Sequence, residues 1–402
     1  MSHVMNTYAR LPVAFVRGEG VWLWDDAGRK YLDGLAGIAV NTLGAAHPKL
    51  SRAIGACVAS GVVHASNLFR IPAQEAAADR IAEITGLDEV FFCNSGCEAN
   101  EAAIKIARLY GHKRGVERPE IIVFEKAFHG RTLATLSATG SRKVQAGFEP
   151  LVSGFVRVPL DDLDAVRAIA EHNRNVVAVL IEPIQGEGGI HVSRMEYLRT
   201  LKQICERNEW LFMADEVQCG LGRTGQWFVY QHAGISPDVV ALAKGLGGGL
   251  AVGACVAGNR AKGVFSPGKH GSTFGGNPLA CTAVAATIDA MREEGLLENA
   301  SKVGRAIRDG LAGGLAGTAG FVEVRGMGLM IGIELDRACG DIVTMALERG
   351  LVLNVTAENV VRLLPPLVMT EAEGLQLVDI LLPTIKDFLA RPAAATPVAK
   401  AG

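Results

Sequence analysis

The sequence predicts an α/β fold, with a mostly parallel seven-stranded sheet in a large domain and a smaller α+β domain built from both chain ends. Three observations favour this prediction. The chain has 402 residues, which is enough for two domains. From about residue 90 to 290, short apolar runs alternate with helical patterns, as is typical of a parallel sheet covered by helices on both faces. Before residue 60 and after about 290 this alternation stops.

Seven apolar runs of four to six residues are the expected strands of the large sheet. They are residues 90–93, 121–124, 155–158, 176–181, 211–214, 239–243 and 253–257. One intervening helix is expected to begin at Ser193, which forms a capping-box pattern with Glu196. Leu198, Leu201 and Cys205 then fall on one face of that helix, which therefore packs on the sheet.

Both ends of the chain carry a different pattern. The segment FVRGEGVWLWDDAGRKYLDG predicts short strands with turns at Gly20 and at residues 26–28. The C-terminal part mixes helices with expected strands at 321–324 and 329–334. These two ends are expected to combine into the smaller domain.

The domain boundaries follow from these changes in pattern. Residues 56–290 are expected to form the large domain, and residues 1–55 and 291–390 the small one. The last residues, 391–402, read RPAAATPVAKAG and carry no core pattern, so we expect a disordered tail.

Composition excludes several classes of partner. A net charge of -2 and 49% hydrophobic residues give no bulk attraction to nucleic acid or to an anionic membrane. There is no leader and no run of 18 apolar residues, so we expect a soluble, cytoplasmic protein. The eight cysteines show no zinc or disulfide spacing, and no metal site is predicted.

Lys244 stands between the apolar run 239–243 and a glycine-rich turn. A lysine at such a place is expected to be partly desolvated, which disfavours its charged form. The neutral amine is a nucleophile that forms Schiff bases with carbonyl compounds. The alternative is that the side chain extends from the strand end into solvent. The residues at the other strand ends bear on this choice, because ligands of open parallel sheets bind beyond the carboxyl ends of the strands.

Ser95 follows the first expected strand and forms a capping-box pattern with Glu98, so a helix is expected to begin here. Gly96 lets a ligand approach the backbone closely. Free N–H groups at a helix N-terminus bind phosphate, which makes this turn a candidate phosphate site. An ordinary helix start is the alternative.

Two further strand ends carry polar or aromatic residues. Phe128 after the second strand can stack on a flat cofactor, and Arg131 can hold a carboxylate with two hydrogen bonds. A solvated basic loop explains the same residues. Glu182 after the fourth strand is a weak signal alone, since a glutamate at a strand end is often only a turn contact.

Asp215 and Glu216 end the fifth strand. Successive strand residues point to opposite faces, so the two are poorly placed to act as a pair, and only one is expected to face the site. A single carboxylate there suits a cationic ring nitrogen, because a charge-assisted hydrogen bond favours the protonated heterocycle.

Gly220, Gly222 and Gly225 spell G-x-G-x-x-G, the dinucleotide fingerprint, with Asp238 not far from the expected acidic position. The surrounding sequence does not fit that motif. DEVQ intervenes after the strand, and QWFVYQHAG after the glycines lacks a small-residue helix start. A nicotinamide site is therefore not predicted.

Six segments, NSGCEANEAAIKIAR, FHGRT, EPIQGEGG, ADEVQCGLGRTG, ALAKGLGGG and GSTFGGNPLA, occur in this order. Together they resemble the class III aminotransferases, fold-type I enzymes that use pyridoxal 5′-phosphate. The segments PVAFVRGEGVWLWD, YLDGLAGIAVNTLG and HASNLF are most similar to the acetylornithine aminotransferases of arginine biosynthesis. The resemblance implies a homodimer with shared active sites. Its reaction would move the δ-amino group of N2-acetylornithine to 2-oxoglutarate, giving N-acetylglutamate 5-semialdehyde and glutamate.

The resemblance also implies roles for individual residues. Lys244 would carry the cofactor and move a proton, and Asp215 would pair with the ring nitrogen. The other cofactor contacts would be Ser95, Gly96, Cys97, Phe128, Val217, Gln218 and, from the neighbouring subunit, Thr273. The substrate contacts would be Arg131, Ser272, Arg362 and Glu182, with Glu182 as the ion-pair partner that masks Arg362 in one half-reaction.

Two positions depart from the family pattern. Cys97 stands where threonine or alanine is common, and Ala46 replaces a histidine before the HP of GAAHP. Ornithine, succinylornithine, succinyl-diaminopimelate and 4-aminobutyrate aminotransferases remain alternatives on the same fold. A pyridoxal phosphate aminomutase or racemase is disfavoured by Arg362, and a non-catalytic binding protein by Lys244 together with Asp215.

Overall fold

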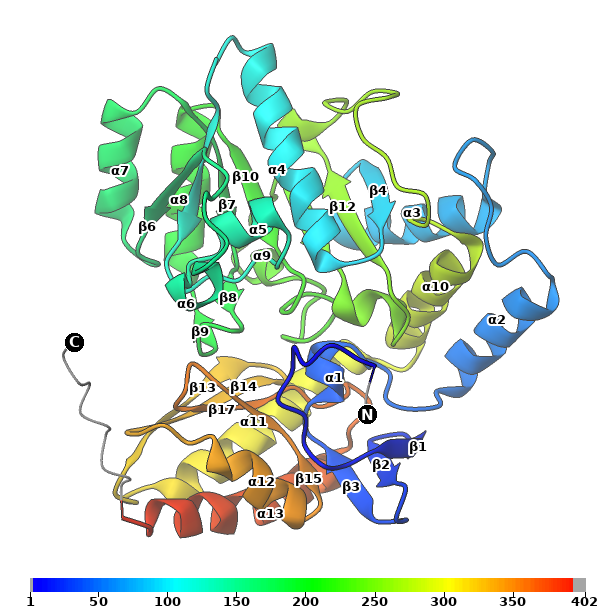
Figure 1. The fold of residues 1–402 in the computed structure, drawn as a ribbon, viewed down its shortest axis with the longest axis vertical. Coiled ribbons are helices and arrows are strands. Elements are labelled where there is room, and N and C mark those ends of the chain that lie inside the picture. Colours follow the sequence, from blue (N-terminus) through cyan, green and yellow to red (C-terminus); the bar gives the residue numbers. More distant parts are fainter. Residues whose placement is uncertain (1–2, 393–402) are drawn as a thin grey trace.

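The computed structural model describes residues 3–392, so all but the first two residues of the expected tail lie outside the described part. A seven-stranded sheet forms the upper body in Figure 1, in the order β4-β12-β11-β10-β7-β5-β6. Its strands are β4 (Glu89–Cys93), β5 (Glu120–Phe124), β6 (Phe155–Val158), β7 (Val176–Ile181), β10 (Leu211–Asp215), β11 (Val239–Leu242) and β12 (Gly253–Ala257). All run parallel except β12, which is antiparallel to both neighbours. The predicted sheet is thus confirmed.

Helices cover both faces of this sheet, which explains why its strands are apolar throughout. All six residues of β7 are buried. On one face Leu180 shares a core with Ile104 of α4 (Gly96–Lys113), and on the other Val179 shares a core with Leu198 of α8 (Met195–Arg207). Each fully buried aliphatic side chain stabilises the fold by roughly 1.5–3 kcal/mol relative to exposure.

The N-terminal and C-terminal parts of the chain meet below the large sheet (Figure 1). Leu32 of β3 pairs in parallel with Leu351 of β15, which joins the N-terminal strands to the C-terminal region in the sheet β1-β2-β3-β15. A second sheet has the order β13-β14-β17-β16, and β8 and β9 form a short ribbon. These strands are β1 (Phe15–Glu19), β2 (Trp22–Asp25), β3 (Lys30–Asp33), β8 (Ile184–Gln185), β9 (His191–Val192), β13 (Phe321–Met327), β14 (Met330–Leu335), β15 (Leu351–Val352), β16 (Asn354–Thr356) and β17 (Val360–Leu363). The strands expected at both ends are confirmed, while the exact domain boundaries stay a prediction.

The remaining helices surround these sheets, and α11 packs along α13 under the C-terminal strands. They are α1 (Ala36–Ala39), α2 (Pro48–Ala59), α3 (Pro72–Thr85), α5 (Leu133–Ala138), α6 (Arg142–Gln145), α7 (Leu163–His172), α9 (Val229–His232), α10 (Pro278–Glu293), α11 (Leu296–Leu315), α12 (Asp341–Glu348) and α13 (Glu371–Leu389). Two short 3-10 helices are η1 (Lys244–Gly247) and η2 (Asn259–Ala261). Within residues 3–392, none of the helices combines the length and apolar character needed to cross a membrane.

The capping box expected at Ser193 is wrong. Helix α8 begins at Met195 after Arg194, and the Ser193 hydroxyl is buried without a hydrogen-bond partner among the described residues. The reason is that the Ser193 backbone N–H donates to the Pro183 carbonyl at 3.0 Å, directly after the β8-β9 ribbon. The chain is therefore held in the ribbon at the residue where the local pattern favours a helix.

Candidate active site

The predicted strand-end residues gather at the carboxyl edge of the large sheet. There they line one cavity of about 420 Å³, which falls within the range of about 300–1,000 Å³ that is usual for ligand sites. The sequence-predicted residues that line it are Ser95, Gly96, Cys97, Phe128, Glu182, Asp215, Val217, Gln218 and Lys244. Residues from the ends of five strands, β4, β5, β7, β10 and β11, thus converge as the rule for parallel sheets predicts.

Lys244 follows β11 directly and begins η1 with a positive φ of 45°. Its half-buried side chain lines the cavity, and Nζ has no hydrogen bond or ion pair with any residue of the described part of the chain. Withdrawal from water lowers the pKa of this amine below its ordinary value, and the Arg362 charge acts in the same direction. Lys244 is therefore an accessible amine with an increased tendency to be neutral, as expected for a nucleophile.

Asp215 ends β10 and is only 3% exposed. Its Oδ2 accepts hydrogen bonds from Asn100 Nδ2 at 2.7 Å and from His129 Nδ1 at 2.8 Å, while Oδ1 accepts one from the Val217 backbone N–H at 3.1 Å. A carboxylate offers about four acceptor directions. One direction on Oδ1 therefore remains for a ligand.

Glu216 points to the other side of the strand, as the alternation of strand residues predicts. It accepts hydrogen bonds from the Tyr230 backbone N–H at 3.1 Å and from the Cys219 thiol at 3.1 Å. Burial raises the pKa of the Glu216 carboxyl to about 7. Only Asp215 of the two faces the cavity.

The turn before α4 has the geometry of an anion site. The Ser95 hydroxyl caps the helix by accepting from the Glu98 N–H at 3.2 Å, whereas Glu98 itself accepts from the Asn94 N–H rather than from Ser95. The N–H groups of Gly96 and Cys97 have no hydrogen-bond partner in residues 3–392. A Cβ on Gly96 would lie 2.7 Å from Val217 Cγ1, so glycine is what lets this N-terminus approach Val217. Free N–H groups and the helix dipole together favour a phosphate here.

Phe128 and Glu182 belong to neighbouring strand ends and are joined by a hydrogen bond. Glu182 Oε2 accepts from the Phe128 backbone N–H at 2.6 Å, which positions the aromatic side chain at the cavity wall. The second oxygen, Oε1, accepts from the Gly186 N–H at 3.4 Å. Burial and the nearby Asp215 charge raise the pKa of Glu182 well above its ordinary value. Burial thus favours the protonated form of Glu182.

Arg362 of β17 is 1% exposed. The prediction that Glu182 is its ion-pair partner is wrong. Arg362 Nη1 lies 2.5 Å from Glu187 Oε1 and donates to Gln218 Oε1 at 3.2 Å, while Nε donates to Asn354 at 3.1 Å. Glu182 is excluded because both its oxygens face backbone N–H groups. Burial raises the pKa of Glu187, but Arg362 outweighs this effect and holds it below its ordinary value.

The remaining predicted substrate contacts lie at or beyond the rim of this cavity. Arg131 is exposed, with its guanidinium 5.7 Å from the Phe128 ring centre, and borders an adjoining cavity of about 760 Å³ that Glu187 also lines. The Ser272 hydroxyl accepts from the Gly275 N–H at 2.9 Å. Neither Ser272 nor the exposed Thr273 lines the cavity of its own chain.

The two departures from the family pattern lie in different places. The Cys97 thiol accepts a hydrogen bond from the Arg131 backbone N–H at 3.2 Å, so this side chain joins the α4 turn to the loop that follows β5. Ala46 lies on the rim of a separate cavity beside His47, which pairs with Glu294. Its replacement of histidine therefore does not touch the site.

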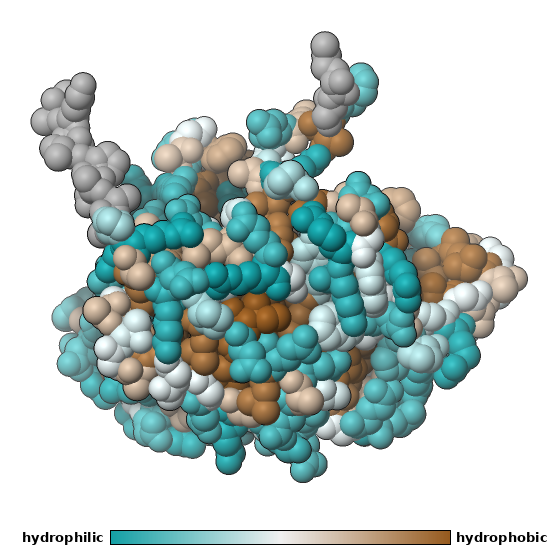
Figure 2. All heavy atoms as spheres, turned by 90° about the horizontal axis from the view of Figure 1, so that it is seen from below, coloured by the Kyte–Doolittle hydropathy of each residue, from teal (hydrophilic) through white to brown (hydrophobic). Residues whose placement is uncertain are grey.

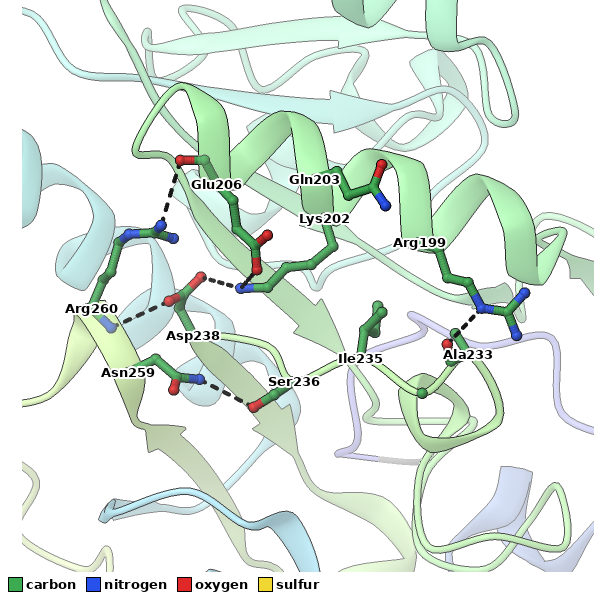
Figure 3. A pocket seen from close by; sticks show the side chains of 11 residues that line it. Arg199, Lys202, Gln203, Glu206, Ala233, Ile235, Ser236, Asp238, Asn259 and Arg260 are labelled. Atoms are coloured by element: carbon green, nitrogen blue, oxygen red, sulfur yellow. Dashed lines mark hydrogen bonds and ion pairs between the residues drawn. The ribbon is translucent and has the colours of Figure 1, made fainter.

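Another cavity, of about 660 Å³, lies at the opposite edge of the sheet, where β11 begins (Figure 3). Its charged side chains already have partners: Lys202 lies 3.3 Å from Asp238 and 3.8 Å from Glu206, and Asp238 also accepts from the Arg260 backbone N–H. None of the predicted site residues lines it. Asp238 is thus occupied in structural contacts, and the short α9 begins at Val229, after Gly225.

Comparison with known proteins agrees with this geometry. The family model described as aminotransferase class-III matches residues 4–385. The chain belongs to the class-III aminotransferases. The acetylornithine aminotransferase of Nitrosomonas europaea is a similar class-III relative, 56% identical over 97% of this chain and 99% of its own length. Acetylornithine aminotransferase 1 of Bordetella pertussis is also 56% identical, with the same shares covered.

Solved class-III structures have the same fold. The ornithine aminotransferase of Toxoplasma gondii ME49 gives a TM-score of 0.92 at 32% identity, covering 96% of this chain and 93% of its own. The acetylornithine aminotransferase of Elizabethkingia anophelis gives 0.87 at 36% identity, covering 96% of each chain. The predicted fold-type I architecture is confirmed.

Pyridoxal 5′-phosphate is the cofactor of this class-III aminotransferase, and the cavity fits it. The α4 N-terminus supplies unpaired N–H groups for a phosphate, and Lys244 supplies an unpaired amine for an aldehyde. Asp215 supplies a buried carboxylate with a remaining acceptor direction for a protonated ring nitrogen.

Three residues of this site escaped the sequence interpretation: Asn100, His129 and Glu187. Asn100 lies one helical turn after Gly96, so the helical repeat was the available signal that it faces the same side. His129 adjoins Phe128, and Glu187 is the second glutamate of EPIQGEGG. No local pattern distinguishes the functions of Glu182 and Glu187.

Proposed function

We propose that the protein transfers the δ-amino group of N2-acetylornithine to 2-oxoglutarate, giving N-acetylglutamate 5-semialdehyde and glutamate, a step of arginine biosynthesis. The observation that carries this proposal is the 56% identity, over 97% of this chain, to relatives named acetylornithine aminotransferase. The site geometry supports it, because the groups that the half-reactions need line the cavity or, in the case of Arg362, bond to Gln218, which lines it.

We assign proton transfer to Lys244 and charge stabilisation to Asp215. When bound, pyridoxal 5′-phosphate accepts the amino group and withdraws electrons from the carbon that loses its proton. The Lys244 amine, with no competing hydrogen bond, holds the cofactor between turnovers and then takes and returns that proton as general base and acid. Asp215 keeps a proton on the ring nitrogen through its remaining acceptor direction.

Arg362 and Glu187 allow one site to accept two kinds of amine donor. N2-acetylornithine reacts at a terminal carbon, which bears no carboxylate, whereas glutamate reacts at a carbon that does. With Glu187 on Arg362 the buried cation is neutralised, as the first half-reaction requires. When Glu187 moves away, Arg362 is free to bind the α-carboxylate of glutamate or 2-oxoglutarate with two hydrogen bonds.

The outer end of the donor is assigned to the adjoining cavity of about 760 Å³. Arg131 borders that cavity with its guanidinium exposed, and is suited to the carboxylate of the acetylornithine end. Ser272, on the loop beside Asn94, is the second residue we assign to substrate binding.

We also propose a homodimer in which Thr273 reaches the phosphate of the partner's cofactor. Exposed apolar side chains support this proposal, because large apolar patches mark interfaces. Figure 2, seen from below, shows apolar atoms gathered on the projecting side that carries α2 and the chain after it. In the chain after α2, the side chains of Val62, Leu68 and Phe69 are exposed. The exposed Phe274 lies near His64 of the same segment.

A mixed dimer tests the shared site. Chains carrying Lys244→Ala and chains carrying Thr273→Ala are each expected to be impaired. If Thr273 acts across the interface, the mixed dimer has one site with both defects and one intact site. Restored activity in mixed dimers therefore supports the proposal, while a mixture that stays as inactive as its components contradicts it.

The cytoplasm is the proposed location. The eight cysteines are all free, and six of them are buried, as is common for proteins of a reducing compartment. The domain division at about residues 55 and 290 is likewise retained as a proposal, with the two chain ends joined through β3 and β15.

A donor screen with 2-oxoglutarate as fixed acceptor tests the proposed reaction. N2-acetylornithine is expected to give the highest kcat/KM. Ornithine is the strongest competitor, because ornithine aminotransferases are among the similar structures. Succinylornithine, succinyl-diaminopimelate and 4-aminobutyrate complete the set. A higher kcat/KM for any of these amines would make that amine, and not N2-acetylornithine, the preferred donor. Turnover without a keto-acid acceptor would indicate an aminomutase or racemase instead.

A further inference from the structure

Asn100 connects three segments of the site, although its side chain does not belong to the expected set of cofactor contacts. It lies on α4, one turn after Gly96, and is 1% exposed. Its Nδ2 donates to Asp215 Oδ2 at 2.7 Å and to the His129 carbonyl at 3.0 Å. One amide group therefore joins the phosphate-binding helix, the loop that carries Phe128 and the carboxylate at the end of β10.

These contacts decide which oxygen of Asp215 is available to the cofactor. Asn100 and His129 both bond to Oδ2 and fill its two acceptor directions. Oδ1 accepts a single hydrogen bond, from the Val217 N–H. The remaining direction is therefore on Oδ1, and the orientation of the carboxylate depends on the donors at Oδ2.

The side-chain amide oxygen of Asn100 indicates that this residue is not present for stability alone. Its Oδ1 is buried and has no hydrogen-bond partner within residues 3–392. An unpaired buried acceptor is unfavourable for folding, and an apolar side chain would avoid that cost. The opposite amide orientation would place this oxygen against the Asp215 carboxylate, which is less favourable still.

We infer that Asn100 is a positioning residue of the transamination reaction. It holds the Asp215 carboxylate so that Oδ1 faces the ring nitrogen, and it ties the Phe128–His129 loop to that carboxylate. The kinetic part of this inference rests on the proposed function, whereas the part on cofactor binding does not.

Two substitutions of Asn100 distinguish a role in positioning Asp215 from a role in packing alone. Asn100→Ala removes the donor, and Asn100→Asp keeps the shape but donates to Asp215 only while the new carboxyl is protonated. Asn299→Ala is the matched control, because Asn299 donates from its amide to the Leu367 and Met369 carbonyls, at 2.7 and 2.9 Å, away from the site. The measurements are the Kd of the apoprotein for pyridoxal 5′-phosphate, the pH titration of the absorbance of the bound cofactor, and kcat and KM.

Asn100→Ala is expected to raise the cofactor Kd and lower kcat, each by about tenfold or more, because a hydrogen bond to a charged group is lost. KM for both substrates should change by less than about threefold, since no substrate contact is removed. The absorbance titration should shift in Asn100→Ala and not in Asn299→Ala. Asn100→Asp should be most active at low pH and lose activity as the pH rises, because an ionised carboxylate beside Asp215 repels it.

The inference is overturned if Asn100→Ala keeps the wild-type cofactor Kd, absorbance titration and kcat within twofold. It is also overturned if Asn299→Ala gives the same losses. If Asn100→Ala does not fold, the pH profile of Asn100→Asp decides, and an unaltered profile overturns the inference. Failure of every amine donor would refute the proposed function alone, because the Kd and the absorbance titration still test Asn100.

Discussion

Arg362 lies 2.5 Å from Glu187 and not against Glu182, although both glutamates belong to the segment EPIQGEGG. Glu182 is fixed by the Phe128 and Gly186 N–H groups at the end of β7. The Glu187 side chain is 38% exposed, whereas Arg362 is buried. The glutamate that can leave the arginine is therefore the one nearer to solvent.

Substitution of Glu187 is expected to shift the balance between the two half-reactions. Glu187→Ala leaves Arg362 without its carboxylate, so the arginine is available to glutamate and unfavourable to a donor with no carboxylate at the reacting carbon. The ratio of kcat/KM for glutamate to that for acetylornithine should rise by about tenfold or more. Single-turnover absorbance changes with each donor measure this ratio.

The sequence-derived candidate Glu182 provides the comparison. Glu182→Gln should not raise this ratio, because its oxygens bond to backbone groups and not to Arg362. An unchanged ratio in Glu187→Ala would refute the masking function of Glu187. A rise in Glu182→Gln would instead support the original ion-pair hypothesis.

Gly96 is expected to tolerate no side chain while Val217 is present. An added Cβ would meet Val217 Cγ1 at 2.7 Å, which forces the α4 N-terminus away from the cavity. Gly96→Ala should raise the Kd for pyridoxal 5′-phosphate by about tenfold or more. Adding Val217→Ala should recover much of this loss by making room. A double variant as weak as Gly96→Ala would show that the close approach is not the cause.

Glu216 should make folding stability depend on pH, although it does not face the cavity. Burial raises the pKa of this carboxyl from 4.5 to about 7, so the folded state binds the proton more tightly than the unfolded state does. Its stabilising contribution is complete below about pH 4.5 and is lost as the pH rises through about 7. The loss is on the order of 3 kcal/mol.

Urea unfolding at pH 5.5 and 8.5 measures this effect. The free energy of unfolding of the wild type should fall between these values, and that of Glu216→Gln should fall less, because glutamine does not titrate. An equal fall in the free energy of unfolding between the two pH values in both proteins would contradict the assignment of the titration to Glu216.

Much of this site was predictable because its main signals are local. Lys244 and Asp215 each follow an apolar run that ends at the carboxyl edge of the sheet, so strand prediction alone places them together. The contacts of Asn100 with Asp215 and of Arg362 with Glu187 join residues 115 and 175 positions apart, and no local pattern specifies them. The prediction of a capping box at Ser193 was wrong for a similar reason, because a backbone contact with Pro183 overrides the local capping pattern.

The most direct test of the account is to locate the covalent bond between cofactor and protein. The holoenzyme is reduced with borohydride, digested, and its peptides are examined by mass spectrometry. A pyridoxyl phosphate group on Lys244, absent from Lys244→Ala, is the predicted result. A label on another lysine, or none in protein that binds the cofactor, would contradict the assignment of Lys244 and the chemistry built on it.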